Sequence, residues 1–384
     1  MTSRPPKSME TIEKAPAGLV VCKSGSQALA IRSAALVARG LKDLARESNW
    51  TRKPAFVGKA SKVAMSSSGL ICAISAESRN TPPRVVVHDL HNSYGQLALA
   101  VPGETPAMAK HLPASFAWSR TGRYLAGAWA AWQPAVHVFD LEGKEFSGSF
   151  GKFQQLPSHI AWSSDSAHIA AATTGSKHAS LRLWRSGIGD GPLQDAPLGQ
   201  AAVPDWLERQ TYEAEFGEEG AFHGYGKTIF SPDGKQVASV VEIQGEWADD
   251  AILFAEVPSL KRLQSFQAQG HVSDLTWLAG GDAIVFCAAA QGYKLDLASM
   301  QSEQLPFDAE TCAAHPSLPL LACYTSWQKE SAKGHLFLAD LRTGSRYDEC
   351  EADGVVEIRW SEDGSKAYAV SKDGMAYIYE PELL

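Results

Sequence analysis

One two-stranded hairpin recurs along the whole chain, and this repeat constrains the fold more than any other feature. Each copy has an alternating apolar strand, a tight polar turn and a second apolar strand. Turns such as SPDG (231–234) and SEDG (361–364) supply Pro or Asp early and Gly late, as tight turns require. The seven copies begin at Val63, Phe116, Ile160, Thr228, Leu275, Cys312 and Ile358. A chain that repeats one supersecondary unit is expected to fold as a repeat architecture.

A third strand follows each hairpin, and a turn and a weaker fourth strand come after it. The third strands read RVVVHDL, AVHVFDL, SLRLWRS, AILFAEV, YKLDL, HLFLADL and MAYIYEP. The first strand of each unit ends at an anchor position: Met65, Trp118, Trp162, Phe230, Trp277, Ala314 and Trp360. Successive anchors lie 53, 44, 68, 47, 37 and 46 residues apart. Four strands per unit with a period in the forties are typical of a β-propeller. We therefore predict an all-β fold, a seven-bladed β-propeller.

The second strand of each unit is rich in small residues, for example Ala126-Gly127-Ala128 and Ala170-Ala171-Ala172. Nearly continuous apolarity predicts that these strands are covered on both faces. Small side chains allow neighbouring sheets to approach closely near a common axis.

The seventh unit ends at YIYEPELL after only three strands, so one strand is missing. The N-terminal part of the chain holds an unassigned apolar segment, GLVVCKS (18–24). We predict that an N-terminal strand completes the last blade and leaves no open sheet edge. The expected organisation is a disordered tail over 1–16 and one propeller over 17–384, with a long inserted loop at 199–226. Residues 26–48 fit a helix or two further strands.

The hairpins resemble those of WD40-like and TolB-like propellers, whose repeats contain Trp-Ser-Pro-Asp-Gly followed by an apolar strand with Ala. Phe230-Ser231-Pro232-Asp233-Gly234 matches best, and Trp360-Ser361-Glu362-Asp363-Gly364 is next. The resemblance spans roughly residues 60–384. It departs from WD40 repeats because the Trp-Asp pair is missing, with Phe139-Asp140, Trp184-Arg185 and Ala339-Asp340 in its place, and a Gly-His pair precedes a first strand only once, at Gly270-His271. The resemblance implies partner proteins or peptides that dock on one rim or over the central channel.

In a propeller, the connections between strands one and two and between strands three and four lie on one face, here called the turn face. The other connections lie on the opposite face, here called the loop face. Aromatic residues gather in the loop-face connections, and the acidic 199–226 segment opens there as well. The candidate binding residues are Trp129, Trp132, Trp206, Tyr225, Trp247 and Trp327. Long loops in compact domains are often functional, so we predict a docking surface for a protein or peptide partner. The alternative is that these rings only pack the ends of the blades.

Composition limits the other partners. The chain has 35 Lys and Arg against 43 Asp and Glu, a net charge of −8, which disfavours nucleic acid and anionic membranes. Residues 30–62 hold eight bases against two acids, which suits an acidic partner. Six scattered cysteines without a CxxC pair, no signal-type N-terminus and no apolar run long enough to cross a bilayer predict a cytoplasmic protein with reduced thiols.

Catalytic patterns are sparse, and we expect no cofactor and no metal. The chain lacks GxSxG and HExxH, and the acids Glu213, Glu215, Glu218 and Glu219 lack a calcium-loop pattern. Seven-bladed lactonases bind a cation at the channel with carboxylates and amides, but Asn49, Asn80 and Asn92 are the only asparagines here, and none lies in a predicted innermost strand. We predict a non-catalytic binding or scaffold protein. The alternatives are an enzyme with a channel site and a small-ligand protein with a pocket beneath 199–226.

Overall fold

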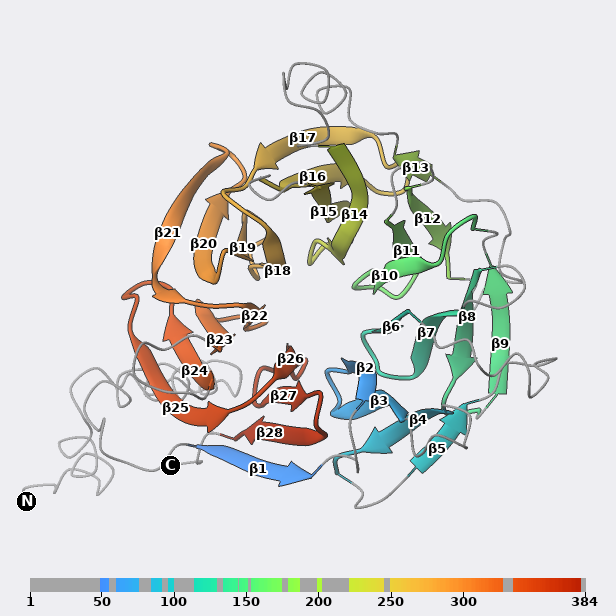
Figure 1. Cartoon of the computed structure of the whole chain (residues 1–384), viewed down its shortest axis with the longest axis horizontal. Coiled ribbons are helices and arrows are strands. Elements are labelled where there is room, and N and C mark those ends of the chain that lie inside the picture. Colours follow the sequence, from blue (N-terminus) through green and yellow to red (C-terminus); the bar gives the residue numbers. More distant parts are fainter. Residues whose placement is uncertain are drawn as a thin grey trace, which may run out of the picture. The chain divides into compact units, whose positions relative to one another are not determined.

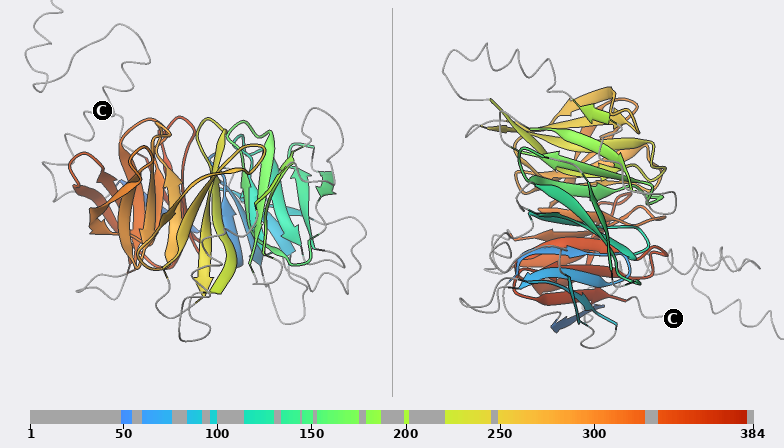
Figure 2. Two further views of the ribbon diagram at one scale, coloured as in Figure 1. Left: turned by 90° about the horizontal axis from the view of Figure 1, so that it is seen from above. Right: turned by 90° about the vertical axis from the view of Figure 1, so that its right-hand side faces the viewer.

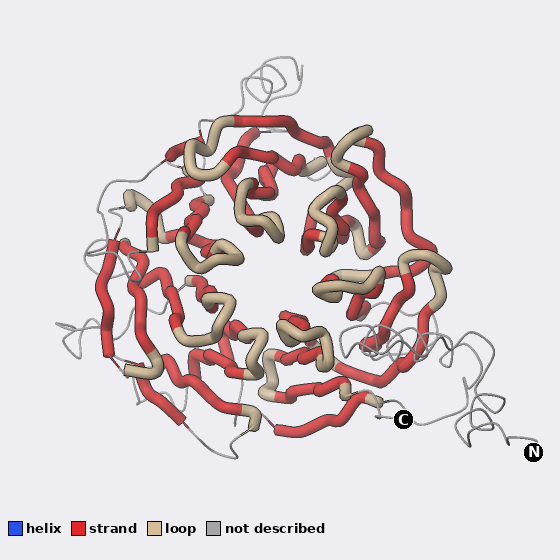
Figure 3. Tube along the Cα trace, turned by 180° about the vertical axis from the view of Figure 1, so that it is seen from behind, coloured by secondary structure: helices blue, strands red, loops and turns tan. Residues whose placement is uncertain are grey.

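The computed structural model describes residues 49–54, 60–75, 84–91, 96–99, 114–129, 134–143, 145–150, 153–174, 179–186, 199–201, 221–244, 249–326 and 334–380. Within these ranges the chain forms strands joined by turns and loops, with no helix (Figure 3). The tail at 1–16 and the segment 26–48 lie outside the described residues. No helix in the described part has the length and apolarity to span a bilayer.

Seven antiparallel four-stranded sheets are arranged around a central axis, as predicted (Figure 1). Blade 1 contains β2 (Ala60–Met65), β3 (Leu70–Ser75), β4 (Arg84–Asp89) and β5 (Gln96–Leu99). Blade 2 contains β6 (Ser115–Trp118), β7 (Tyr124–Trp129), β8 (Ala135–Asp140) and β9 (Glu145–Phe150). Blade 3 contains β10 (Pro157–Trp162), β11 (His168–Thr173), β12 (Leu181–Arg185) and β13 (Gly199–Ala201). Blade 4 contains β14 (Ala221–Phe230), β15 (Gln236–Gln244), β16 (Ala251–Glu256) and β17 (Arg262–Gln267).

Blade 5 contains β18 (Val272–Trp277), β19 (Ala283–Ala288), β20 (Gln291–Asp296) and β21 (Gln301–Asp308). Blade 6 contains β22 (Thr311–Ala314), β23 (Leu320–Thr325), β24 (Gly334–Asp340) and β25 (Arg346–Ala352). Blade 7 contains β26 (Val355–Trp360), β27 (Ala367–Ser371) and β28 (Met375–Tyr379), and its outer strand is β1 (Trp50–Pro54). In every blade the first strand of the repeat is innermost, and the connections lie on two opposite faces (Figure 2).

An N-terminal strand closes the ring, as expected, but it is β1 and not 18–24. β1 pairs antiparallel with β28, with Trp50 opposite Tyr379 and Pro54 opposite Met375. The Trp50 ring is buried, and its centroid lies 5.5 Å from that of Tyr379. β1 lies only five residues before β2, so a short connection brings the chain from the last blade into the first. The segment 18–24 lies outside the described residues.

The predicted inserted loop is shorter than 199–226 in the structure. Residues 199–201 form β13, which pairs with β12, and 221–226 extend β14 along β15. Both ends of 199–226 are therefore hydrogen-bonded to a neighbouring strand of a sheet. Residues 202–220 lie outside the described residues.

The core lies between neighbouring sheets. The second strands are covered on both faces, and every residue of β19, β23 and β27 is buried. Between blades 2 and 3, for instance, Val138 packs in one cluster with Ile169 and Trp184. Ala126 and Ala128 of β7 and Ala171 of β11 belong to the same cluster, and Ala170 and Ala172 pack in the cluster between blades 3 and 4, which explains why Ala recurs in these strands.

Three anchor tryptophans, Trp118, Trp162 and Trp360, hydrogen-bond their inner strand to the preceding blade. The indole Nε1 of Trp118 donates to the Ala64 carbonyl oxygen at 3.1 Å. Trp360 donates in the same way to the Ala313 carbonyl at 3.0 Å. In both pairs the acceptor lies one residue before the anchor of the preceding blade. The same hydrogen bond therefore fixes the relative position of the two inner strands in each case.

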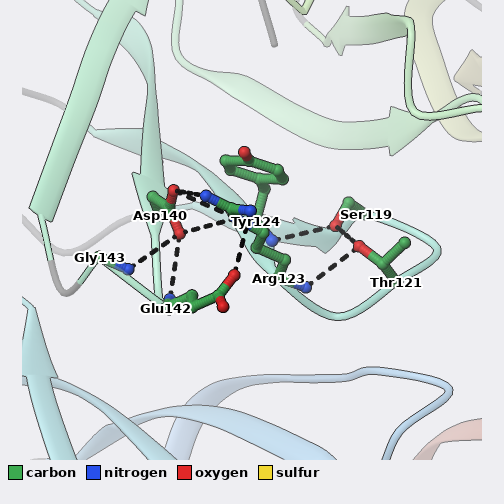
Figure 4. Close-up of polar contacts among 7 residues, drawn as sticks. All are labelled: Ser119, Thr121, Arg123, Tyr124, Asp140, Glu142 and Gly143. Carbon is green, nitrogen blue, oxygen red and sulfur yellow. Dashed lines mark hydrogen bonds and ion pairs between the residues drawn. The ribbon is translucent and has the colours of Figure 1, made fainter. Parts of the chain in front are cut away.

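Hydroxyl and carboxylate side chains order the turn-face hairpins. Ser231 donates to Asp233 Oδ1 at 2.7 Å, and the same carboxylate oxygen accepts the Lys235 backbone N–H. In blade 2, Ser119 and Thr121 replace this pair, and Arg123 reaches across to Asp140 at the end of β8 (Figure 4). These turns are internally satisfied and solvated, as the sequence predicts.

Candidate functional site in the central channel

A ring of polar residues occupies one level of the inner strands. Each member lies three residues before the anchor of its blade. We call these seven residues the channel ring: Lys62, Ser115, His159, Lys227, Asp274, Thr311 and Glu357. Every blade thus places a charged or hydrogen-bonding side chain at the same height, although the inner strands are otherwise largely apolar. This regularity marks the level as a candidate site.

A backbone irregularity accompanies the ring. The inner-strand register shifts between Pro157 and His159, and likewise just before Asp274 and Glu357. In β14 and β2 the shift spans the ring residue itself, Lys227 or Lys62. The remaining two inner strands, β6 and β22, begin at their ring residue. β-bulges re-aim side chains and are common beside functional sites, and the ring coincides with such an irregularity in five of the seven blades.

The ring residues lean toward the next blade. Successive side chains on a strand point to opposite faces, and an odd spacing of three places the ring residue opposite its anchor. The anchors contact the preceding blade, so the ring residues face the following one. Asp274 Oδ2 accepts the Cys312 N–H at 3.1 Å, and Glu357 Oε2 accepts the Met65 N–H at 2.8 Å. Lys227 forms an ion pair with Asp274, also across the blade boundary.

Charge is divided around the ring. Blades 1 to 4 contribute Lys62, Ser115, His159 and Lys227, here called the basic arc, and blades 5 to 7 contribute Asp274, Thr311 and Glu357. The two carboxylates are already occupied. Asp274 is buried and bonds Lys227 and backbone N–H groups, and Glu357 also pairs with Arg359 at 2.8 Å.

The basic arc keeps unused capacity. Lys62 is exposed and makes no ion pair within the described part of the chain. Burial, with the nearby charges of Lys227 and Lys62, lowers the pKa of His159 to about 4. The imidazole is therefore neutral at pH 7, and either ring nitrogen can serve as a donor or an acceptor.

The ring lies toward the loop face. Each inner strand runs from the loop face, where it begins, to the turn face, where its anchor ends it. Ser115 and Thr311 are the first residues of their strands. The ring therefore stands below the same face on which the sequence predicts docking.

Most of the predicted binding residues lie outside the described residues, namely Trp132, Trp206, Trp247 and Trp327. Trp129 ends β7 at the loop face, where its backbone pairs with Ala135. Tyr225 is fully buried and packs with Leu183 and Val241 between blades 3 and 4. Its ring therefore belongs to the core, and burial raises the pKa of its hydroxyl.

None of the seven channel-ring residues is among the binding residues predicted from the sequence. The signal was present in the repeat alignment, as a column of polar residues in strands that are otherwise apolar. Among the described residues, no group of three or more His, Cys, Asp or Glu side chains is placed to hold a metal ion.

Neither a family model nor a curated protein matches the sequence. Among solved structures, a chain of the "Crystal Structure of Mitotic Checkpoint Complex" superposes with a TM-score of 0.60. The match covers 88% of this chain and 96% of that chain, at 12% sequence identity. The chain has a WD40-like propeller fold.

A buried aspartate pairs with a histidine at the junction of blades 4 and 5. At Gly270-His271, the Gly-His pair that precedes a first strand, His271 Nδ1 lies 2.7 Å from Asp250 Oδ2. Asp250 is buried, and its carboxylate accepts the N–H groups of Ile243 and Val272, so it ties the loop before β16 to the start of β18. At the ends of the third strands, Asp140 and Asp340 instead pair with Arg123 and Arg342. In these two blades an arginine thus pairs with the aspartate that ends the third strand.

Proposed function

We propose that this protein is a non-catalytic binding or scaffold protein whose loop face docks a protein or peptide partner. The partner covers the channel mouth, with an acidic segment toward the basic arc. The structural neighbour belongs to a multiprotein complex, which supports protein partners in general. Rim contacts come from Trp129, Trp132, Trp206, Trp247 and Trp327, because aromatic side chains dominate the energetics of such interfaces.

The observation behind this proposal is that Asp274 and Glu357, the two carboxylates of the channel ring, are already hydrogen-bonded within the protein. Asp274 and Glu357 hold backbone N–H groups of the next blade, so their lone pairs are committed to structure. A general base or a cation ligand needs a carboxylate with free capacity. The basic arc, in contrast, offers Lys62 and His159 toward a ligand. The ring therefore favours recognition over hydrolysis of the lactonase type.

We also propose a cytoplasmic location. Cys287 and Cys312 are buried free thiols whose Sγ atoms lie 3.6 Å apart across blades 5 and 6. Thiols this close are compatible with a reducing compartment.

Affinity capture with matched variants tests the docking proposal. The wild-type chain, the Trp132→Ala/Trp327→Ala double variant and a Leu263→Ala control are immobilised, and captured proteins are quantified by mass spectrometry. Leu263 is an exposed apolar residue on the outer strand β17. We expect a protein that the wild type and the control retain and the double variant loses. Equal capture by all three baits would contradict docking through the loop-face tryptophans.

A further inference from the structure

The basic arc of the channel ring has the composition of an oxyanion site. Its four members come from consecutive blades and comprise two lysines, one imidazole and one hydroxyl, without a carboxylate among them. Carboxylate and phosphate groups are bound through charge-assisted hydrogen bonds from such donors. The net charge of the chain is −8, so a cationic arc on one side of the channel is not a consequence of composition.

We propose that the channel ring binds one oxyanion, a carboxylate or a phosphate group, among Lys62, His159 and Lys227, and that His159 takes up a proton from solvent as the anion binds. This inference goes beyond the proposed function, since a free anion can occupy the ring whether or not a protein partner docks.

His159 faces cations from the surrounding elements. Lys227 lies on the adjacent inner strand β14 and Lys62 on β2, and both disfavour the imidazolium. The remaining titratable groups on the strands packed around β10 are His168 on β11, His223 and Tyr225 on β14, and Tyr124 on β7, while β6 has none. The acids nearest in the ring are Asp274, which is paired with Lys227, and Glu357, which is paired with Arg359. In the free protein no unpaired ring acid stabilises a charged His159.

A bound anion reverses this balance. Its negative charge offsets the repulsion from both lysines and accepts a hydrogen bond from the imidazolium, so the protonated form becomes favourable. By linkage, the anion then binds more tightly as the pH falls through the raised pKa of His159 toward about 4, its value in the free protein. Lys227 contributes by sharing its ammonium between Asp274 and the ligand, since an ammonium has three donors.

Replacement of Lys62 is expected to raise the pKa of His159 and to weaken anion binding. A purely structural role of Lys62 would not produce both effects. Lys62→Met removes a repulsive charge, so the pKa of His159 in the free protein rises. The same change removes an anion contact, so the anion binds about tenfold more weakly, as expected for one charge-assisted bond. Lys62 is exposed, so this variant keeps its fold.

The test is an NMR titration of the His159 imidazole in the full chain, assigned with His159→Gln, with and without sulfate, an anion that does not titrate in this range. Parallel arms at pH 6 use inorganic phosphate and a glutamate-rich peptide, to distinguish the two sources of the oxyanion. The control is Lys235→Met, which removes a lysine on the turn face whose side chain is 80% exposed.

We expect saturating sulfate to raise the pKa of His159 by about one unit or more, and Lys62→Met, but not Lys235→Met, to weaken sulfate binding. Tighter binding of the peptide or of phosphate identifies the source and supports the site in either case. Identical His159 titration with and without all three anions would overturn the inference, as would equal binding by the two lysine variants. Neither result depends on whether a docked protein partner is found.

Discussion

The indole Nε1 of Trp162 donates a 2.9 Å hydrogen bond to the carbonyl oxygen of Ala117, on the inner strand of the preceding blade. Trp162→Phe leaves this carbonyl without its donor, and we expect a loss of about 1–3 kcal/mol in the free energy of unfolding, measured by urea denaturation. Trp277 is a matched control, because its buried Nε1 has no hydrogen-bond partner among the described residues. Trp277→Phe removes the same atoms without breaking such a bond and is expected to cost less. Equal losses would mean that the bond between blades contributes nothing.

A second prediction concerns Gly364 in the last turn-face hairpin. Its φ is +70°, and a β-carbon there would overlap the imidazole of His315 from blade 6, which also lies 3.1 Å from the Gly364 carbonyl oxygen. Gly354 has a similar φ of +60°, and a β-carbon added there would meet no atom within 4 Å. We expect Gly354→Ala to cost about 1–2 kcal/mol from backbone strain alone, and Gly364→Ala to cost about 1–3 kcal/mol more from the overlap. Thermal unfolding of both variants measures the difference, and equal shifts would contradict tight packing between blades 6 and 7.

The buried histidines make the fold sensitive to acid. Burial lowers the pKa of His137 to about 4, and His159 has a similarly lowered pKa. Between about pH 6.5 and pH 4 the unfolded chain binds more protons at these positions than the folded chain, so stability falls as the pH decreases through this window. Each histidine contributes a slope of about 1.4 kcal/mol per pH unit there.

Urea unfolding at a series of pH values tests this sensitivity. We expect His137→Gln to flatten the pH dependence by the contribution of one group, whatever its effect at pH 7. The raised pKa values of Glu242 and Asp250 act in the opposite direction, because these acids take up protons more readily in the folded state. An unchanged slope in His137→Gln would show that this histidine is not held neutral by the fold.

The Arg123–Asp140 pair predicts a measurable coupling on the turn face. The guanidinium donates to both carboxylate oxygens and holds the pKa of Asp140 below its usual value (Figure 4). A double-mutant cycle with Arg123→Met and Asp140→Asn is expected to give about 1 kcal/mol, because the geometry is bidentate and Asp140 is buried. The exposed pair Arg120–Glu362, with a single contact at 3.2 Å, is the control, and its coupling is expected to be about 0.3 kcal/mol. Equal couplings would remove the argument for a special role of Arg123.

The repeat alone predicted most of the fold, because a hairpin with fixed turn chemistry and apolar periodicity permits one strand order per blade. The closing strand was misplaced. Trp50–Pro54 carries Arg52 and Lys53 in a short outer edge, so it lacks the apolar run that made 18–24 conspicuous. An outer edge strand is held by backbone hydrogen bonds to one neighbouring strand and by side-chain packing on one face. A hydropathy pattern reveals neither of these.

The candidate site was harder to predict, for two physical reasons. The ring is assembled from one residue per blade, so no local motif marks Lys62 or His159. The β-bulges that set these residues apart depend on pairing between strands, and periodicity does not register a single extra residue. Tyr225 shows the opposite error, since its place beside a long loop predicts a binding residue, whereas its side chain lies in the core.

Site-specific photo-crosslinking tests the central claim, docking at the loop face, most directly. Lys372 and Glu362 are both exposed residues of blade 7, the first in a loop-face connection and the second in a turn-face hairpin. A photoreactive side chain is introduced at one position or the other, and the protein is irradiated with the partner that affinity capture returns. The account predicts a cross-linked partner from position 372 and none from position 362. Cross-linking from position 362 alone would place the partner on the turn face and contradict the account.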